Sequence, residues 1–267
     1  MEHIIVCIKQ VPDFSKVREA PINPKTGAIM RAGIPSVLNP FDKYAIEEAL
    51  RLRDASGGRV TAITMGPPQA GAVLEDALIM GADRAVLLCD PAFAGADTLA
   101  TSCALAGAIR KLQPIDLVVC GQETADSGTG HIAPSLAEWL DLPQITFVRK
   151  IEIGDGLVQA QRAIEGGYQK IEGRLPLVIS VARDINQPRP LRLRDIAAAA
   201  AREITVWTLS DLGLERDTVG APGSPTQVPR VFPPAPRQQT EILAGPPSAA
   251  VEGLVARLRE LRAIQSV

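Results

Sequence analysis

Short runs of apolar, often β-branched residues alternate along the first half of the chain with longer segments of helical periodicity. Each run is flanked by turn residues and is apolar almost throughout, as a strand buried on both faces must be. The runs are His3–Ile8, Arg59–Met65, Arg84–Cys89 and Ile115–Cys120. The helical segments, with apolar residues at i, i+3 and i+4 spacing, are Phe41–Arg53, Gln69–Met80, Thr98–Leu112 and Ile132–Leu140. Because repeated strand–helix–strand units form right-handed crossovers, the pattern predicts an α/β fold with a doubly wound, mostly parallel sheet.

Local signals mark the ends of two of these helices. In the run Asn39-Pro40-Phe41-Asp42, Asn39 is a preferred N-cap residue and Pro40 suits the first helical position. Asp42 is placed to bond back to the cap in the manner of a capping box. Gly81 follows Met80 and is expected to end that helix, because glycine tolerates the positive φ of a C-cap.

The second half of the chain has a different pattern. Ile145–Ile153 and Leu157–Ile164 surround the turn Gly154-Asp155-Gly156, which predicts a β-hairpin extension. Pro176–Ala182 is expected to form another buried strand.

Beyond Arg202 the chain is expected to leave the folded domain. Eight of the 22 prolines fall between Pro222 and Pro247, in a stretch too aperiodic to carry a core of its own. Ser248–Ile264 then shows the apolar stripe of an amphipathic helix, which needs a surface to cover. The sequence therefore predicts a domain over residues 1–202 and a Pro-rich C-terminal arm with a terminal helix over residues 203–267.

Composition excludes several classes of protein. The net charge of -2 argues against nucleic acid as the main partner, because binding phosphates needs an excess of Lys and Arg. The chain contains no apolar run near the roughly 20 residues that cross a bilayer, and its first residues do not resemble a signal peptide. The four cysteines are scattered in or near apolar runs, which is typical of buried, reduced thiols. We therefore expect a cytoplasmic protein without membrane insertion.

The candidate binding loops follow from the topology, because open α/β sheets bind ligands beyond the carboxyl ends of their strands. The loops that follow the four parallel strands are Cys7–Asp13, Met65–Gln69, Asp90–Asp97 and Gly121–Ile132. The last one is the most informative. It carries three glycines and the hydroxyls of Ser127 and Thr129, and it leads directly into a helix. Glycine allows close backbone approach and a helix start offers N–H donors, so this loop suits a phosphate, although an ordinary βα loop is the alternative.

The sequence contains no catalytic set to accompany this loop. The chain has neither the G-x-x-x-x-G-K-[ST] motif nor a G-x-G-x-x-G after the first strand. His131 has no obvious nucleophile to activate, and neither His3 nor His131 lies at metal-ligand spacing from another histidine or cysteine. Asp126 is a conceivable general base, but a carboxylate in such a loop more often orders backbone N–H groups or a ribose. Binding without independent turnover is the favoured interpretation.

Taken together and in order, several motifs resemble the β subunit of electron transfer flavoproteins, the FixA family, over nearly the whole chain. The motifs are Val6-Cys7-Ile8-Lys9-Gln10-Val11-Pro12-Asp13, Ser36-Val37-Leu38-Asn39-Pro40-Phe41-Asp42, Met65-Gly66-Pro67-Pro68-Gln69-Ala70, Ala77-Leu78-Ile79-Met80-Gly81-Ala82-Asp83, the Gly121–Ile132 loop, Gly166-Gly167, Pro176-Leu177-Val178-Ile179-Ser180-Val181 and Asn186-Gln187-Pro188-Arg189. The resemblance implies the adenine-nucleotide-binding α/β superfamily and a heterodimer with an FAD-bearing α subunit, which the C-terminal arm embraces.

The resemblance also implies a set of nucleotide-binding positions in this chain. They are Cys7, Asn39, Pro40, Phe41, Asp42, Met65, Gly121, Gln122, Glu123, Thr124, Ala125, Asp126, Ser127, Gly128, Thr129, Gly130, His131 and Ile132. The nucleotide is AMP in many members and a second FAD in the electron-bifurcating ones, which take hydride from NADH. Phe93–Ser102, Met65–Ala70 and Gly223–Val228 resemble the FAD-holding branch, so FAD is favoured over AMP. Gly128 and His131 replace an aspartate and a glutamine usual in that branch, which leaves bifurcation open.

The same resemblance implies a recognition loop over about residues 184–196. Through this loop the β subunit docks flavoproteins of the acyl-CoA dehydrogenase type, before electrons pass to a quinone reductase or another acceptor. Leu193 falls at the apolar anchoring position, and Arg189, Arg192 and Arg194 would make the loop basic enough to steer an acidic partner. The alternative is that Leu193 packs on its own domain.

Two other functions fit an adenine-nucleotide fold. An ATP-using enzyme that adenylates or hydrolyses would carry a Ser/Gly-rich loop after the first strand, whereas this chain has Lys9-Gln10-Val11-Pro12-Asp13 there. A stress-type ATP-binding homodimer would not need the arm beyond Asp211.

Overall fold

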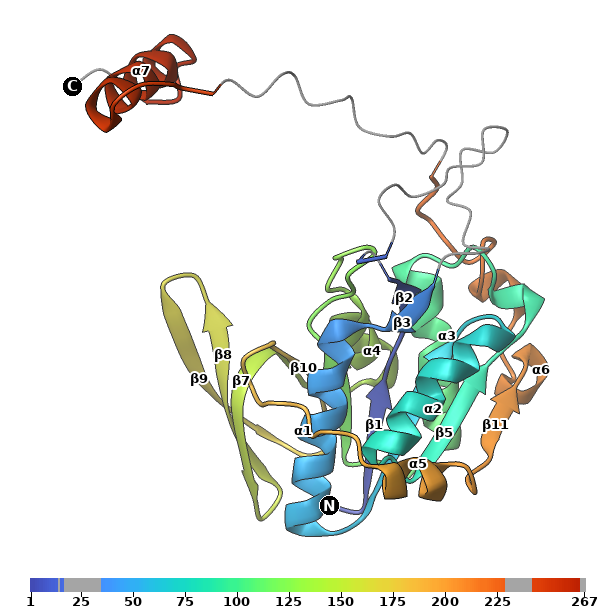
Figure 1. Ribbon diagram of the computed structural model, residues 1–267. Helices are drawn as coiled ribbons and strands as arrows, with labels where there is room; N and C mark the ends of the chain where they lie inside the picture. Colours follow the sequence, from blue (N-terminus) through green and yellow to red (C-terminus); the bar gives the residue numbers. More distant parts are fainter. Residues whose placement is uncertain (14, 17–34, 229–241, 265–267) are drawn as a thin grey trace.

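The computed structural model describes residues 1–13, 15–16, 35–228 and 242–264. Within these ranges, one sheet of nine strands runs through the molecule in the order β11-β5-β4-β1-β6-β10-β7-β8-β9 (Figure 1). The strands are β1 His3–Cys7, β4 Arg59–Met65, β5 Arg84–Leu88, β6 Leu117–Gly121, β7 Gln144–Gly154, β8 Leu157–Ile164, β9 Gly167–Arg174, β10 Leu177–Val181 and β11 Ile204–Trp207. Two short strands, β2 Gln10–Pro12 and β3 Ser36–Leu38, pair separately above the main sheet.

The central part of the sheet is parallel, as the alternating pattern predicts. β1 pairs in parallel with both β4 and β6, and β4 pairs in the same way with β5. β1 is buried at every residue, which explains why its sequence is apolar throughout rather than alternating. The expected α/β fold with a doubly wound, mostly parallel sheet is confirmed.

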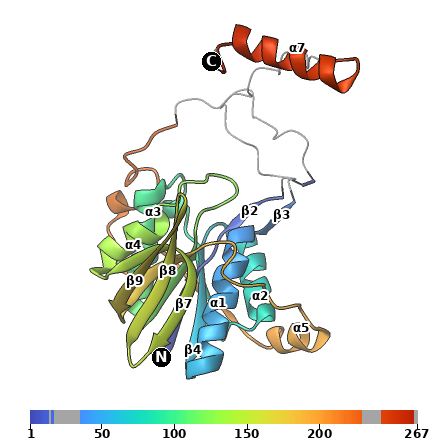
Figure 2. The same cartoon turned by 90° about the vertical axis from the view of Figure 1, so that its left-hand side faces the viewer.

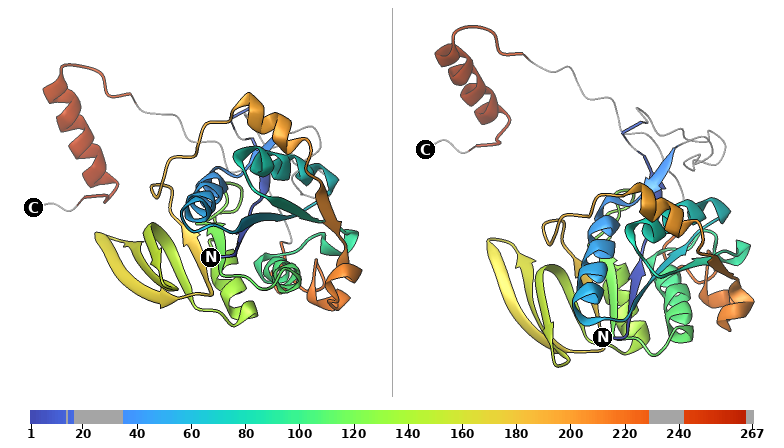
Figure 3. Two further views of the ribbon diagram at one scale, coloured as in Figure 1. Left: turned by 90° about the horizontal axis from the view of Figure 1, so that it is seen from below. Right: turned by 60° about the horizontal axis from the view of Figure 1, so that its bottom comes forward.

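Helices cover both faces of this sheet. The first apolar cluster contains residues of α1 (Pro40–Ser56) and α2 (Gly71–Met80), and the second contains residues of α3 (Thr98–Lys111) and α4 (Ile132–Leu140). Seen along the sheet, the two helix layers lie on opposite sides of the strands (Figure 3). Gly81 ends α2 with φ 123°, and its N–H donates to Ala77 and Leu78 carbonyls, so the expected C-cap is confirmed.

The antiparallel extension is larger than the sequence predicts. β7 and β8 form the expected hairpin around Gly154–Gly156, and β7 also pairs in parallel with β10. A further strand, β9, continues the meander at the edge of the sheet (Figure 2). Its residues are mostly exposed and polar, so it shows no apolar alternation that sequence reasoning could detect.

The folded domain continues beyond residue 202, where the sequence places the arm. Ile204–Trp207 forms β11, which pairs in parallel with β5 and closes that edge of the sheet. The short helix α6 (Leu209–Leu212) follows, and Leu212 and Val219 are buried in the second apolar cluster. The expectation that residues from 203 onward form an arm is therefore corrected, because at least this part of the segment completes the domain.

The terminal helix of the arm is α7, Pro247–Glu260, which lies away from the sheet (Figures 1 and 2). None of its residues is buried, and Val251 and Leu254 of its apolar stripe are exposed. Residues 229–241, the middle of the expected Pro-rich arm, lie outside the described residues. No helix within the described part of the chain combines the length and apolar character that a membrane span requires.

Candidate functional site

The loops singled out by the sequence meet where the strand order reverses. The chain runs from β1 to β4 and β5 on one side, then crosses through α3 to β6 on the other side of β1. β1 and β6 are in register, with Cys7 opposite Cys120, so the loops that follow them start side by side. Such a switch point is where open α/β sheets bind their ligands.

A buried carboxylate anchors the start of α1 beneath these loops. Asp42 is 4% exposed, and its Oδ2 accepts a hydrogen bond of 2.7 Å from the backbone N–H of Lys9. Its Oδ1 accepts a second bond of 2.9 Å from Asn39 Nδ2. Burial raises the pKa of Asp42 to about 7, and the donors from Asn39 and Lys9 only partly oppose this effect. Asp42 therefore titrates near neutral pH.

The capping box expected at Asn39 is not formed. Asn39 occupies the N-cap position, but its side chain makes no capping bond, and its backbone N–H donates to the Lys9 carbonyl instead of to Asp42. The Asn39 amide reaches across to the Gly121–Ile132 loop, donating 2.9 Å to the Glu123 carbonyl and accepting 3.1 Å from the Ala125 N–H. The side chain fastens the loop to α1, because its amide contacts Asp42 in the first turn of the helix as well as Glu123 and Ala125 in the loop.

Gly121 is required by the close contact between this loop and α1. A Cβ at this position would lie 2.4 Å from Asp42 Oδ1 and 3.0 Å from the Phe41 carbonyl carbon. The helix start therefore packs directly on the backbone that leaves β6. Phe41 is half-buried and Pro40 is exposed at this junction.

An ion pair joins the loop after β1 to the loop after β6. Lys9 Nζ lies 2.8 Å from the carboxylate of Asp126, whose side chain is only 9% exposed. This contact engages Asp126, which the sequence suggested as a group that orders a loop or a ribose. Lys9 itself was not among the predicted site residues, although a lysine after the first strand and an aspartate after the last parallel strand were both visible in the sequence.

The loop then turns toward α4 through glycines. The N–H groups of Ser127 and Gly128 donate to the Thr124 carbonyl, and the Thr124 and Ser127 hydroxyls lie 2.7 Å apart. Gly128 and Gly130 have φ of 61° and 65°, which favours glycine at both positions. His131 occupies the N-cap of α4 without a capping side-chain bond. The first N–H groups of a helix have no partner within the helix, so this loop brings donors suited to a phosphate to the switch point.

A second group of loops lies beyond β4 and β5. Met65 ends β4 and is half-buried against the second apolar cluster. Asp97 caps α3 by accepting from the Leu99 and Ala100 N–H groups, and it also accepts 3.0 Å from the Thr226 N–H. Ser224 is buried, and its hydroxyl accepts 2.8 Å from the Asp97 N–H. The Gly223–Val228 segment thus lies beside the Asp90–Asp97 loop.

Not every predicted side chain faces these loops. Cys7 is 7% exposed and belongs to the apolar cluster on the α3 and α4 face, together with Cys120. All four cysteines are free thiols, and Cys7, Cys103 and Cys120 are buried.

The predicted recognition loop overlaps a short helix, α5, Leu193–Ala199, which has no counterpart among the helices that the sequence predicts. Leu193 is its first residue and is 87% exposed, so it does not pack on its own domain. Arg194 lies 3.6 Å from Asp195, while Arg189 turns to the body of the protein and pairs with Glu47 and Asp54. Of the three expected basic residues, Arg189 therefore already has intramolecular partners.

Comparison with known proteins shows the family of this chain. A family model described as the electron transfer flavoprotein domain matches residues 26–212. The chain is 45% identical to the electron transfer flavoprotein subunit beta of Thermoanaerobacterium thermosaccharolyticum, over 98% of this chain and 100% of that protein. It is 43% identical to protein FixA of Azorhizobium caulinodans, over 96% and 93% of the two chains. It is 42% identical to subunit CarD of the caffeyl-CoA reductase–Etf complex of Acetobacterium woodii, over 96% and 98%.

Proposed function

The chain belongs to the electron transfer flavoprotein β-subunit family, which includes FixA, and we propose that it binds an adenine nucleotide and mediates electron transfer as one subunit of a heterodimer. The observation that carries the nucleotide proposal is the junction at the switch point. There Asn39, Asp42 and Gly121 hold the glycine-containing loop against the start of α1. The binding residues proposed are those expected from the resemblance, with Lys9 added because it holds Asp126.

We propose FAD as the nucleotide of this subunit, with AMP as the alternative. The preference for FAD is supported by Phe93–Ser102 and Gly223–Val228, which resemble the FAD-holding branch and which the contacts of Asp97 with Ser224 and Thr226 bring side by side. A bound FAD would supply electron-accepting chemistry, while this chain would position the phosphates and exclude water from them. Gly128 and His131 depart from the pattern of the bifurcating branch, so the proposal does not include bifurcation or NADH oxidation.

The test is the nucleotide content of the purified heterodimer. Two flavins per heterodimer are expected if this subunit holds FAD, and one flavin with one AMP if the nucleotide is AMP. Absence of any adenine nucleotide beyond the α-subunit FAD would overturn the binding proposal. ATP hydrolysis by the isolated chain would favour the enzyme alternative.

The proposed partners are the electron transfer flavoprotein α subunit, an acyl-CoA dehydrogenase-type flavoprotein, and a quinone reductase or other acceptor. The exposed apolar stripe of α7 supports the first, because an amphipathic helix needs a covering surface. The relative CarD is named as part of a caffeyl-CoA reductase–Etf complex, which supports an acyl-CoA-type flavoprotein partner. We place the protein in the cytoplasm.

The exposed Leu193 supports docking of the dehydrogenase through α5. Replacing Leu193 with Ala should slow reduction of the heterodimer at limiting dehydrogenase by about tenfold, the effect of losing an interface anchor. Nucleotide content should stay unchanged. Val206→Ala, at an equally apolar position 54% exposed on the edge strand β11, is the matched control and should reduce at the wild-type rate. Equal kinetics in both variants would remove Leu193 from the docking surface.

A further inference from the structure

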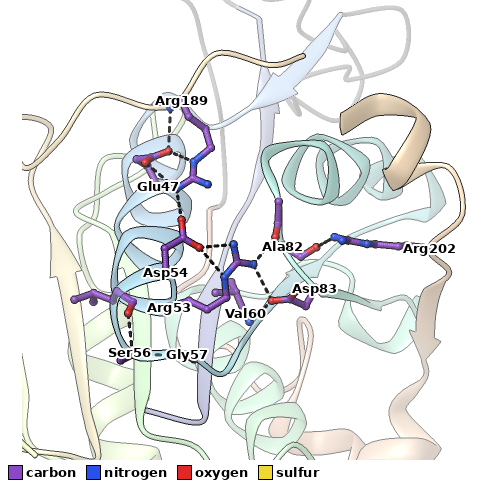
Figure 4. A network of polar contacts seen from close by, with 12 residues as sticks. Glu47, Arg53, Asp54, Ser56, Gly57, Val60, Ala82, Asp83, Arg189 and Arg202 are labelled. Carbon is purple, nitrogen blue, oxygen red and sulfur yellow. Dashed lines mark hydrogen bonds and ion pairs between the residues drawn. The ribbon is translucent and has the colours of Figure 1, made fainter. Parts of the chain in front are cut away.

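The segment that carries Leu193 is held to the body by two nearly buried carboxylates of α1. We define the docking segment as residues 184–199. Glu47 is 5% exposed, and its carboxylate accepts three hydrogen bonds from Arg189, one from the backbone N–H at 2.9 Å and two from the guanidinium at 2.9 and 3.2 Å. Figure 4 shows the Arg189 guanidinium between Glu47 and Asp54, whose Oδ2 lies 3.1 Å from Nη2.

A second contact lies three residues earlier in the docking segment. Asn186 Nδ2 donates 3.0 Å to the Tyr44 carbonyl and 2.9 Å to the carboxylate of Glu48. Both partners are acceptors, which fixes the orientation of the amide. Glu48 is 1% exposed and also pairs with Arg51 at 2.8 Å. Removing a partner from a buried carboxylate is costly, so these contacts favour the conformation in which Arg189 and Asn186 face α1.

Beyond Arg189 the docking segment has no polar ties to the body among the described residues, and α5 lies against α2. Among the described residues, no hydrogen bond or ion pair joins residues 190–198 to the sheet or to α1 and α2. Ala199 is buried in the first apolar cluster, and Arg202 donates to the Ala82 carbonyl just after it (Figure 4). Leu193 therefore lies at the start of a helix that contacts α2, on a segment whose nearest polar contacts with the body are at Arg189 and, beyond Ala199, at Arg202.

We propose that Arg189 and Asn186, paired with Glu47 and Glu48, are positioning residues that hold the docking segment ready for its flavoprotein partner. The proposal rests on the proposed function. The same helix begins at Asn39 and Asp42 in the candidate nucleotide site, so α1 sets the docking segment at a fixed place relative to that site. A segment ordered before binding loses less conformational freedom on docking, and this makes the partner bind more tightly.

The test uses the complete heterodimer with Arg189→Gln, Glu47→Gln and the double variant. Hydrogen exchange at residues 184–199 should become faster in each, and the KM for a reducing acyl-CoA dehydrogenase should rise by about tenfold, with kcat and nucleotide content unchanged. The double variant should have the same exchange rates and KM as the single variants, because each single substitution already disrupts the same contact between Arg189 and Glu47. Glu47→Gln keeps the side-chain shape, so this variant still tests the positioning role if Arg189→Gln fails to fold.

Arg53→Gln is the matched control. Arg53 belongs to the same network on α1 and pairs with Asp54 and Asp83, but it does not contact the docking segment (Figure 4). It should lower stability without changing exchange at residues 184–199 or the KM. If the Arg189 and Glu47 variants behave like this control, the positioning role is wrong. If the wild type is not reduced by the dehydrogenase, the proposed partner fails, while the exchange measurement still decides whether the contacts hold the segment.

Discussion

Replacing Gly121 with Ala tests whether the junction between β6 and α1 holds the nucleotide. The backbone of Gly121 does not have a positive φ, so the substitution adds volume without backbone strain. The new Cβ would lie 2.4 Å from Asp42 Oδ1, and a carbon and an oxygen do not normally approach that closely. Either the carboxylate or the start of α1 must move.

The size of the effect follows from the bonds that such a movement breaks. Asp42 is buried and holds Lys9 and Asn39, and Asn39 holds the loop at Glu123 and Ala125. Overpacking costs about 1–3 kcal/mol, and a buried polar group left without a partner costs about as much again. If the substitution destabilises the nucleotide-bound form by roughly 3 kcal/mol more than the free form, the affinity for nucleotide drops by about 100-fold.

The assay is nucleotide content of the heterodimer after dialysis, together with the dissociation constant for added nucleotide. Gly154→Ala is the matched control, because Gly154 has open space around its Cβ position and no positive φ. The control should retain nucleotide like the wild type. Retention by Gly121→Ala equal to that of Gly154→Ala would refute the assignment of this junction as part of the site.

Three further predictions concern the same region. Asp42 has a pKa of about 7 in the folded protein against 3.8 in the unfolded chain, so between these pH values it is protonated mainly in the folded state. The unfolding free energy of the wild type, measured relative to Asp42→Asn in denaturant titrations, should therefore fall by roughly 2–3 kcal/mol from pH 5 to pH 8. Parallel pH profiles of the two proteins would contradict this. Lys9→Gln should weaken nucleotide binding by about threefold to tenfold. The difference in affinity between wild type and variant should be smaller in high salt, because the pair with Asp126 is partly exposed. A difference that does not depend on salt would argue against the ion pair. Ser224→Ala should lower the unfolding free energy by about 1–3 kcal/mol, because it leaves the Asp97 N–H without its acceptor, and unchanged unfolding would show that this contact is dispensable.

The parts of the fold that the sequence predicts are those in which burial imposes a pattern. β4 and α4 have the bounds expected, because a strand buried on both faces and an amphipathic helix each leave a periodic signature. β9 and β11 were missed for the opposite reason. Both are edge strands, with polar or half-exposed residues in β9 and only four residues in β11, so neither needs a continuous apolar run.

In the candidate site, too, some residues could be predicted from the sequence and others could not. Glycines and hydroxyl residues in the Gly121–Ile132 loop could be found from the sequence, because topology places that loop at a switch point. The role of Asn39 could not be predicted from the sequence, because the local pattern assigns this residue to helix capping while its partners, Glu123 and Ala125, are remote in sequence. Lys9 was missed for a similar reason, because only the folded chain brings it to Asp126.

The arrangement of the strand ends also offers a way to separate the two nucleotide alternatives. We propose that AMP contacts mainly the loops after β1 and β6, where Lys9, Asn39 and Gly121 lie. A dinucleotide is longer, and we propose that from the same phosphate position it extends over the neighbouring ends of β4 and β5, where Asp97 and Ser224 meet. Ser224→Ala should therefore weaken FAD binding while leaving AMP binding unchanged, whereas Gly121→Ala should weaken both. Equal affinities of Ser224→Ala and wild type for FAD would place the ligand on the β1 and β6 half alone and would favour AMP.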